Sequence, residues 1–328
     1  MIRNQWYVIL ESREVKRGRL LAVRRMGRDL VLWRDTKGTI SCMSDHCIHR
    51  GVALSAGKLK GNCVECPFHG LQYDGKGRVT VIPANGKKTP VPVTFQGEAF
   101  VVREAHDYIY LWWGEAREEY PELPFIPGLD DTRLVYGTWR DPWNAFYARA
   151  IENQLDVVHL PFVHYNTIGA GNKTLVNGPV ARMEGNVLRV WVDNEKDHGQ
   201  TPRGPEEMAV PERESQLTFV FPNLWQNNLG PTTRITAAFV CVDGENSILY
   251  LRFYRSFGRF PVVRQVIDLL TGLADITIAH QDRRVVQTQR PFVSSLNGGE
   301  KLIQGDLPIV LYRRRREQLQ KEAGAPRA

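Results

Sequence analysis

The sequence has little that would mark a secreted, membrane-embedded or repetitive protein. Its N-terminus, MIRNQWYVIL, lacks the basic segment, long apolar core and small-residue cleavage site of a secretory signal. The longest apolar run starts at Val262, but Arg264, Asp268 and Asp275 interrupt it, so it falls short of the roughly 20 apolar residues of a membrane span. No low-complexity tract is present. We therefore expect a cytoplasmic protein that does not cross a membrane.

Cysteine is also scarce, with five in 328 residues, which excludes a disulfide scaffold. Positive charge is in modest excess: the formal net charge is +7, and part of it lies in one run, Arg313 to Arg316. We interpret this run as the solvated basic end of a helix. A docking surface for an acidic protein is the alternative, and nucleic-acid binding is not expected.

The chain is long enough for two domains. Residues 1–114 read as short strands separated by the turn signals DTKG, YDGKG and EAHD, which predicts an all-β domain. The following segment, GEAREEYPELPFIPGLDD, concentrates acidic residues and three prolines, and neither a helix nor a central strand tolerates these prolines well. We therefore place a linker at 115–130 and a second domain at 131–328.

The second domain is expected to combine helices with an antiparallel sheet. A helix is predicted from about Trp143, and the strand-like runs NVLRVWVD, SQLTFVF, TRITAAFVCVD and NSILYLRFY follow it. A long helix from about Pro261 to Gln289 closes the domain. This order predicts an α+β, helix-grip-like fold in which the sheet wraps around helices and leaves a cavity between them.

Residues 46–70, HCIHRGVALSAGKLKGNCVECPFHG, hold two cysteines and two histidines as CxH and CxxH, separated by 16 residues. Thiolate and imidazole ligands indicate zinc or an iron-sulfur cluster. The spacing suits two hairpin loops and favours a Rieske-type 2Fe-2S cluster, with Cys47 and Cys66 on one iron and His49 and His69 on the other. A structural zinc site is the alternative. We interpret the nearby Cys42, His46 and Cys63 as packing or surface residues.

A second group lies in ENQLDVVHLPFVH, from Glu152 to His164. On a regular helix Asn153, Asp156 and His159 share a face. His159 and His164, five apart, converge only if the helix deforms, and Pro161 between them predicts such a break. Two histidines and a carboxylate would form the facial triad of non-haem Fe(II) enzymes. The alternative is a pair of ordinary core or surface histidines.

The carboxylate is expected from the last long helix. Asp282 aligns with Ile278, Val285 and Val286 on its apolar face, where a metal would offset the cost of burying an acid. Asp275 lies seven residues earlier on the same face and is the competing candidate. We interpret His280 and Arg283 as surface residues.

The segments CIHRG and CPFHG resemble the Rieske proteins, and Arg50 directly after His49 resembles the oxygenase branch. With NQWY near the start, the DxxHxxxxH segment and a late acid, nearly the whole chain resembles the catalytic subunit of Rieske non-haem iron oxygenases. The resemblance implies that His159, His164 and Asp282 bind iron. It also implies that Asp156, with Asn153 nearby, links this iron to the Rieske cluster of a neighbouring subunit in a homotrimer.

The chain is most similar to the shorter group that includes vanillate demethylase and phthalate oxygenase types. This implies that dioxygen is used to hydroxylate, or to N- or O-demethylate, a small organic substrate. GAGNK at Gly169 is a poor dinucleotide fingerprint, so electrons must come from a separate NAD(P)H-dependent reductase, with or without a ferredoxin. Aromatic ring dihydroxylation is one alternative, and a Rieske electron carrier with a non-catalytic binding domain is another. Candidate cavity residues, which are equally ordinary core residues, are Phe221, Trp225, Asn227, Phe239 and Tyr250.

Overall fold

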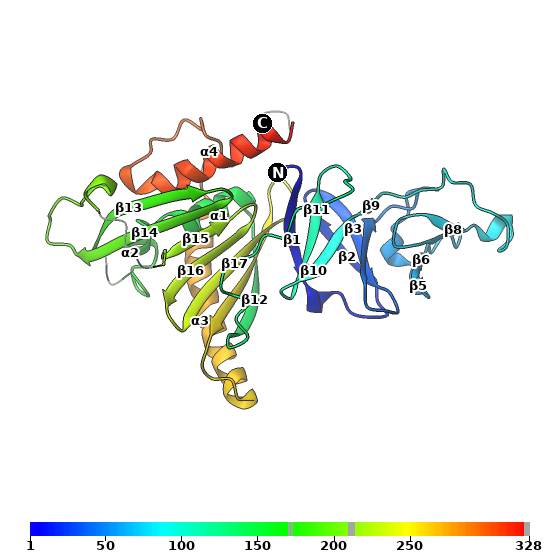
Figure 1. Ribbon diagram of the computed structural model, residues 1–328, viewed down its shortest axis with the longest axis horizontal. Coiled ribbons are helices and arrows are strands. Elements are labelled where there is room, and N and C mark those ends of the chain that lie inside the picture. The colour runs from blue at the N-terminus through cyan, green and yellow to red at the C-terminus, as the bar shows by residue number, and fades with distance from the viewer. Residues whose placement is uncertain (170, 172, 209–213, 325–328) are drawn as a thin grey trace. The chain divides into compact units, whose positions relative to one another are not determined.

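A computed structural model describes residues 1–169, 171, 173–208 and 214–324. Two residues of the GAGNK segment, 170 and 172, and the last four residues of the predicted second domain lie outside the described ranges. The chain divides into two compact units (Figure 1). The N-terminal unit comprises Asn4–Glu115 with the short piece Val242–Gly244, and the C-terminal unit comprises Met1–Arg3, Ala116–Cys241 and the chain from Glu245 onward.

The N-terminal unit is built from strands, which confirms the predicted all-β fold. Its three antiparallel sheets have the strand orders β1-β11-β10, β2-β3-β4-β9 and β5-β6-β7-β8. The strands are β1 (Gln5–Glu11), β2 (Leu21–Arg25), β3 (Arg28–Arg34), β4 (Ile40–Ser44), β5 (Lys58–Lys60), β6 (Cys63–Glu65), β7 (Gln72–Tyr73), β8 (Val79–Val81), β9 (Ala99–Phe100), β10 (Val102–Ala105) and β11 (Tyr108–Trp113).

The predicted turns form for local reasons. Oδ1 of Asp35 accepts the backbone N–H groups of Lys37 and Thr39, and Oδ1 of Asp74 closes the YDGKG turn in the same way. Between β10 and β11, His106 and Asp107 both have positive φ, as a two-residue hairpin turn requires. These turns connect β3 to β4, β7 to β8 and β10 to β11.

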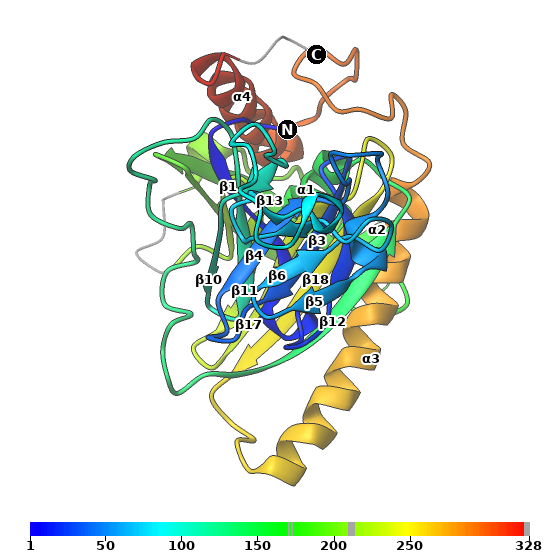
Figure 2. The same ribbon diagram turned by 90° about the vertical axis from the view of Figure 1, so that its right-hand side faces the viewer.

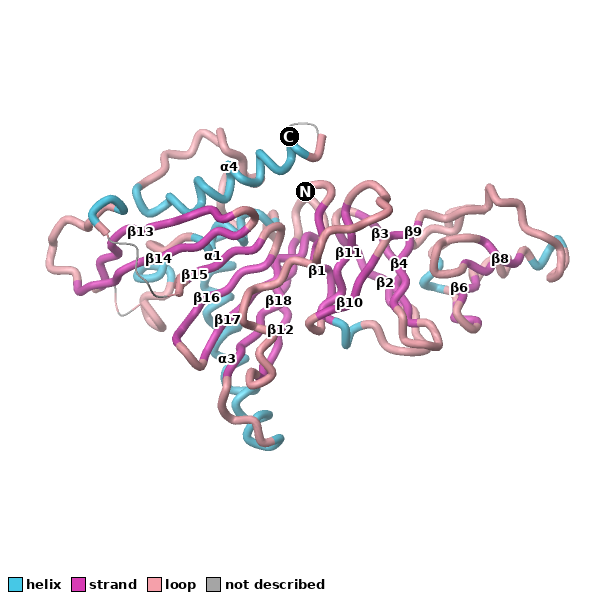
Figure 3. The backbone as a smooth tube through the Cα atoms, in the orientation of Figure 1, coloured by secondary structure: helices cyan, strands magenta, loops and turns pink. Residues whose placement is uncertain are grey.

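The C-terminal unit contains one seven-stranded antiparallel sheet, whose neighbouring strands are visible in Figure 3. Its order is β12-β18-β17-β16-β15-β14-β13. Strands β13 to β18 form a meander, and the last of them, β18, pairs with β12, which comes first in the chain. The strands are β12 (Val135–Trp143), β13 (Thr174–Glu184), β14 (Val187–Lys196), β15 (Leu217–Val220), β16 (Leu224–Gly230), β17 (Thr233–Cys241) and β18 (Ser247–Arg255).

In the described part of this unit, four α-helices accompany the sheet: α1 (Tyr147–Leu155), α2 (Leu160–Val163), α3 (Pro261–Val286) and α4 (Leu307–Glu322). The long α3, prominent in Figure 2, packs on β12, β18, α1 and α2, whereas α4 packs on β13, β14 and α1. The α+β prediction is therefore confirmed. Among the described helices, none combines the length and the apolar composition needed to cross a membrane.

Two helix boundaries differ from the predictions. Trp143 ends β12 instead of starting a helix, because the strand pairing with β18 continues to this residue and its indole N–H donates to Asp141. The first helix begins only at Tyr147. The long helix ends at Val286 and does not close the domain, because α4 follows it and packs back on the sheet.

The interpretation of the run Arg313–Arg316 as a solvated helix end is wrong. Arg313 is 4% exposed and its guanidinium pairs with the carboxylates of Glu152 and Glu300. Arg316 is also buried, and it donates to Ser294. Two of the four arginines are therefore unavailable for the alternative role of this run as a docking surface, because α4 turns their side chains inward. Arg314 remains exposed.

Candidate metal centres

Two loops of the N-terminal unit carry the four predicted cluster ligands. In the loop after β4, the N–H of Cys47 donates to the carbonyl of Val52 at 2.8 Å. In the loop after β6, the N–H of Cys66 donates to the carbonyl of Leu71, also at 2.8 Å. The two loops thus share one backbone pattern, as the prediction of two hairpin loops around one site requires.

A glycine closes each loop at the same position. The N–H of Gly51 donates to the carbonyl of Cys47, and that of Gly70 donates to the carbonyl of Cys66. Their φ angles are +71° and +73°, a backbone region that glycine occupies without steric penalty. This explains the glycine that ends both CIHRG and CPFHG.

The side chains of these loops converge. Nδ1 of His49 lies 3.2 Å from Nδ1 of His69, and both cysteine side chains are buried in one core cluster. The pKa of the Cys66 thiol is raised, because burial and the nearby Cys47 disfavour its thiolate. Two Nδ1 atoms that face each other and two sulfurs within one core form a suitable donor set for the cluster ligands that the sequence predicts.

Tyr73 adds a hydroxyl group to this site. Its Oη lies 3.1 Å from Sγ of Cys47 and accepts the N–H of Ile48 at 3.1 Å. No sequence pattern predicts this role, because Tyr73 belongs to a separate turn motif. The other nearby side chains behave as predicted: Cys42 is buried, Cys63 is half-buried and His46 is exposed.

The second site forms where a helix breaks. Helix α1 ends at Leu155, Asp156 is extended with ψ 120°, and His159 and His164 flank the short α2. Asn153, Asp156 and His159 therefore do not share one helical face, and that prediction is wrong. The break precedes Pro161, which occupies the first turn of α2. At the break, the side chain of Asp156 accepts backbone N–H groups two and three residues further on, which favours a turn over a continued helix.

The side chain of Asp156 stabilises the turn between α1 and α2. Its Oδ1 accepts the N–H of Val158 at 2.8 Å and the N–H of His159 at 3.1 Å, which are donors that the chain break leaves without helical partners. The same Oδ1 lies 3.8 Å from Nδ1 of His159, too far for a hydrogen bond. Asp156 thus lies beside His159 and fixes the backbone position of this histidine.

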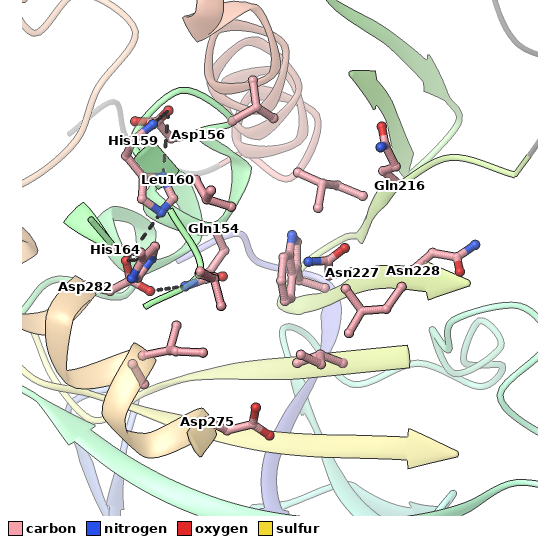
Figure 4. Close-up of a pocket in the computed structure, with 18 of the residues that line it drawn as sticks. Gln154, Asp156, His159, Leu160, His164, Gln216, Asn227, Asn228, Asp275 and Asp282 are labelled. Carbon is pink, nitrogen blue, oxygen red and sulfur yellow. Dashed lines mark hydrogen bonds and ion pairs between the residues drawn. The ribbon is translucent and has the colours of Figure 1, made fainter. Parts of the chain in front are cut away.

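Figure 4 shows His159, His164 and Asp282 turned toward one another. Nε2 of His164 lies 3.0 Å from Oδ1 of Asp282, and Nε2 of His159 lies 3.4 Å from the same oxygen. One candidate ligand atom from each residue lies within 4.8 Å of the other two. Asp282 is 2% exposed on α3. The structure brings these three predicted residues together, and Asp275 lies outside the group.

The electrostatics of the triad reflect close contact between an acid and two imidazoles. Burial opposes ionisation of Asp282, yet His159 and His164 hold its pKa far below the usual range. Burial likewise opposes protonation of His159, but Asp156 and Asp282 raise the pKa of this histidine to about 10.

Oδ1 of Asp282 and Nδ1 of His159 are buried and have no hydrogen-bond partner among the described residues. One buried oxygen faces two ring nitrogens, and a cation there would be bound by all three residues. This donor set fits Fe(II), which the two-histidine, one-carboxylate combination favours.

Two glutamines hold the triad, and sequence reasoning missed both. Oε1 of Gln281 lies 2.8 Å from Nδ1 of His164. If Nδ1 carries the proton and donates it to Gln281, the lone pair of Nε2 points toward Asp282. Nε2 of Gln154 donates to Oδ2 of Asp282 at 3.1 Å. Thr167 also donates to Gln281. Neither glutamine belongs to a recognisable pattern. Asn153 makes no contact with the triad in these interactions, and its Nδ2 is buried without a partner among the described residues.

The triad borders a cavity of about 280 Å³ between α3, α2 and the sheet. Of the predicted cavity residues, Trp225 and Asn227 line it, whereas Phe221, Phe239 and Tyr250 belong to the buried core. The cavity is lined by Gln154, Asp156, Val157, His159, Leu160, His164, Ile168, Val192, Asn194, Gln216, Leu217, Trp225, Asn227, Asn228, Leu229, Ile235, Leu249, Leu251, Asp275, Ile278, Ala279 and Asp282.

The two neighbours of Asp282 on α3 that the sequence predicts at the surface are His280 and Arg283. His280 is exposed, in agreement with that prediction. Arg283 is half-buried instead, and its Nη1 donates to the buried carboxylate of Asp141 at 2.7 Å. This ion pair ties the C-terminal half of α3 to β12.

Comparison with known proteins assigns both parts of the chain. Residues 5–105 match the Rieske [2Fe-2S] domain family, and residues 143–322 match the vanillate O-demethylase oxygenase C-terminal domain family. Aminopyrrolnitrin oxygenase PrnD of Pseudomonas fluorescens is 30% identical over 171 residues, which are 50% of this chain and 47% of that protein. The matched region spans about half or less of the length of the curated relatives.

Solved structures share the fold over nearly the whole chain. Dicamba monooxygenase bound to dicamba superposes with a TM-score of 0.76 at 18% identity and covers 99% of both chains. A carbazole-bound oxygenase in the ferredoxin complex of carbazole 1,9a-dioxygenase gives a TM-score of 0.78 at 17% identity, covering 100% of this chain and 94% of that one.

The Rieske domain implies a 2Fe-2S cluster, and the oxygenase domain of this family uses a mononuclear iron. Both agree with the donor sets that the two units present. The resemblance inferred from the sequence is confirmed, and the chain belongs to the Rieske oxygenases that carry a vanillate O-demethylase-type C-terminal domain.

Proposed function

We propose that this chain is the oxygenase component of a system that monooxygenates a small organic substrate. One atom of dioxygen enters a C–H bond of the substrate, and the other leaves as water with two electrons and two protons supplied from outside. When the oxidised carbon is attached to nitrogen or oxygen, the product loses that carbon and the reaction is a demethylation. The observation that carries the proposal is the triad of His159, His164 and Asp282 at the wall of a cavity of ligand size.

In this proposal His159, His164 and Asp282 bind the mononuclear iron. Such an iron, when bound, supplies the activation of dioxygen. The protein holds the triad through Gln281 on His164 and Gln154 on Asp282, so both ligands keep their orientation. Apolar side chains such as Leu160, Leu217 and Ile278 limit the access of water to the substrate.

Cys47, His49, Cys66 and His69 are the proposed ligands of the 2Fe-2S cluster. The cluster supplies one-electron transfer. His49 is exposed at the surface of the N-terminal unit, which supports an electron exchange site there. In the proposal, Asp156 positions His159 and assists the delivery of electrons and protons to the mononuclear iron. Asn153 is proposed to assist in the same role. Their proposed connection runs to the cluster of a neighbouring subunit in a homotrimer.

The remaining parts of the system are proposed from the same family membership. A separate NAD(P)H-dependent reductase, with or without a ferredoxin, supplies the electrons. The oxygenase of carbazole 1,9a-dioxygenase, which shares this fold, was solved in complex with a ferredoxin. We place the chain in the cytoplasm. We also propose domain limits of 1–114 and 131–328, joined by a linker at 115–130.

Product analysis tests the reaction. The chain, a matching reductase and candidate methoxy- or methylamino-arenes are assayed for dioxygen uptake and formaldehyde. One formaldehyde per dioxygen supports demethylation, and a hydroxylated product without formaldehyde supports hydroxylation. A cis-diol would overturn monooxygenation in favour of ring dihydroxylation, and electron transfer without dioxygen uptake on any substrate would overturn the oxygenase assignment. His159→Ala is the matched control, because it leaves the predicted cluster ligands intact.

A further inference from the structure

The cavity has an ionisable group that the triad does not use. Asp275 lies on α3, seven residues or two helical turns before Asp282, which is about 10 Å along the helix axis. Figure 4 shows Asp275 separated from the three candidate ligands, at another part of the cavity wall. A ligand of small size can therefore contact Asp275 at one end and approach the triad at the other.

The carboxyl group of Asp275 has no partner in the described part of the chain. Its Oδ2 is buried and accepts no hydrogen bond there. Burial raises the pKa of Asp275 to about 7. A buried acid without a partner is costly to the fold, and such groups are concentrated where a ligand completes the interaction. Asp275 therefore requires an explanation beyond packing.

The rest of the wall suits a ligand that is apolar with one positive end. Twelve of the lining side chains are aliphatic or aromatic, including Trp225, whose ring suits a cation. The carboxamides of Asn194 and Asn227 offer carbonyl acceptors to N–H groups, whereas those of Gln216 and Asn228 already accept the backbone N–H groups of Val192 and Gly230. No lysine or arginine is among the described lining residues, so the described wall offers an anionic ligand no counter-charge apart from the triad.

We propose that the cavity selects substrates with an apolar body and a protonated amine, and that the amine forms an ion pair with Asp275. The reacting carbon then lies near His159, His164 and Asp282, at the opposite end of the molecule. The inference rests on the proposed function for the meaning of "substrate", but the recognition by Asp275 is a binding property and is measured without turnover. Asp275 is a specificity-determining residue and takes no part in binding the iron.

A calorimetric comparison of three probes of equal size tests the proposal. Benzylamine, benzyl alcohol and benzoate are titrated into the full-length, iron-loaded protein at pH 8 without dioxygen. Benzylamine is expected to bind at least about tenfold more tightly than either of the others, since the ion pair is buried and charge-assisted. Equal affinities or tighter binding of benzoate would overturn the proposal, and this comparison requires no variant.

Two variants at the same position locate the preference. Asp275→Asn keeps the shape and removes the charge, and it is expected to abolish the preference for benzylamine. Asp275→Glu keeps the charge and is expected to retain most of it. A preference that persists in Asp275→Asn would show that the amine binds elsewhere and would overturn the assignment. If the preference holds but no substrate supports dioxygen uptake, the proposed function fails and the amine site stands; the reverse result sinks the amine site alone.

Discussion

The side chain of His164 is held between two adjacent residues of α3: Nδ1 contacts Gln281 at 2.8 Å, and Nε2 lies 3.0 Å from Asp282. One turn of α3 thus supplies both Asp282, the acid of the triad, and Gln281, which orients the imidazole of His164. This arrangement explains why the triad survives a helix break at Asp156, because α3 fixes the geometry from the opposite side.

Loss of Gln281 is expected to loosen the iron site. Gln281→Ala removes the partner of Nδ1 of His164, and loss of such an outer ligand contact lowers metal affinity by about 10- to 100-fold. The measurement is the iron that remains after dialysis against a graded series of chelator concentrations. Thr288→Ala, at an exposed residue just beyond α3, is the control and should behave as wild type. Equal retention in both variants would contradict the role of Gln281.

Substitution of the two acids on α3 is expected to separate their roles. Asp282→Asn should lose the mononuclear iron and the associated activity, because it removes a charged candidate ligand from the triad. Asp275→Asn should keep its iron, since Asp275 lies outside the group of mutually close ligand atoms. Metal analysis of both purified proteins checks this. Loss of iron in Asp275→Asn with retention in Asp282→Asn would assign the ligand to the other acid.

The buried arginine of α4 is expected to be important for stability. Arg313→Met removes the guanidinium that pairs with Glu152 and Glu300 and leaves Arg149 as the remaining cationic partner of both carboxylates. The expected cost is therefore at most about 3–5 kcal/mol, the cost of breaking a buried pair. Its neighbour Arg314 is exposed, and Arg314→Met should change the free energy of unfolding by less than about 0.5 kcal/mol. Urea denaturation of the two variants provides the comparison. Equal stability would show that the buried pair contributes little.

The stability of the fold is expected to depend on pH through Asp275. Its pKa is about 7 in the folded chain against 3.8 in the unfolded one, so the folded state favours the protonated acid. This favourable contribution is complete below pH 3.8 and is lost as the pH rises through about 7. Asp275→Asn should therefore raise Tm more at pH 8 than at pH 5. Thermal melts at both values test this, with Asp275→Glu as the charged control. A gain that is equal at both pH values would show that Asp275 does not titrate between them.

The hydroxyl of Tyr73 is expected to tune the cluster. A donor near Sγ of Cys47 stabilises the more negative, reduced state, so Tyr73→Phe should lower the reduction potential of the cluster. Redox titration followed by EPR measures this shift, and Tyr108→Phe on β11 is a matched substitution at another buried tyrosine. An unchanged potential in Tyr73→Phe would exclude the hydrogen bond as a determinant.

Local motifs carried much of the prediction. Cys47, His49, Cys66 and His69 were found because each pair lies within one short loop, and its ligand spacing is written directly in the sequence. The turns at Asp35 and Asp74 are predicted from the sequence in the same way. In these cases the interactions that decide the structure join residues only a few positions apart.

Long-range contacts explain the errors. The sequence predicts an exposed Arg313 because neither of its partners, Glu152 and Glu300, is near it in the sequence or part of a recognisable motif with it. The helix face proposed for Asn153, Asp156 and His159 assumed a regular helix, but the side chain of Asp156 forms a turn with the backbone and the helix ends before it. Gln281 and Gln154 acquire their roles only when α1, α2 and α3 pack together.

The central claim is that one chain holds two separate iron sites. Iron and sulfide analysis with EPR on wild type and on His159→Ala tests it most directly. We predict three irons and two sulfides per wild-type chain, two irons from the cluster and one from the mononuclear site. His159→Ala should keep the cluster signal and both sulfides while losing only the third iron. Two irons in the wild type, or loss of the cluster in His159→Ala, would contradict the account.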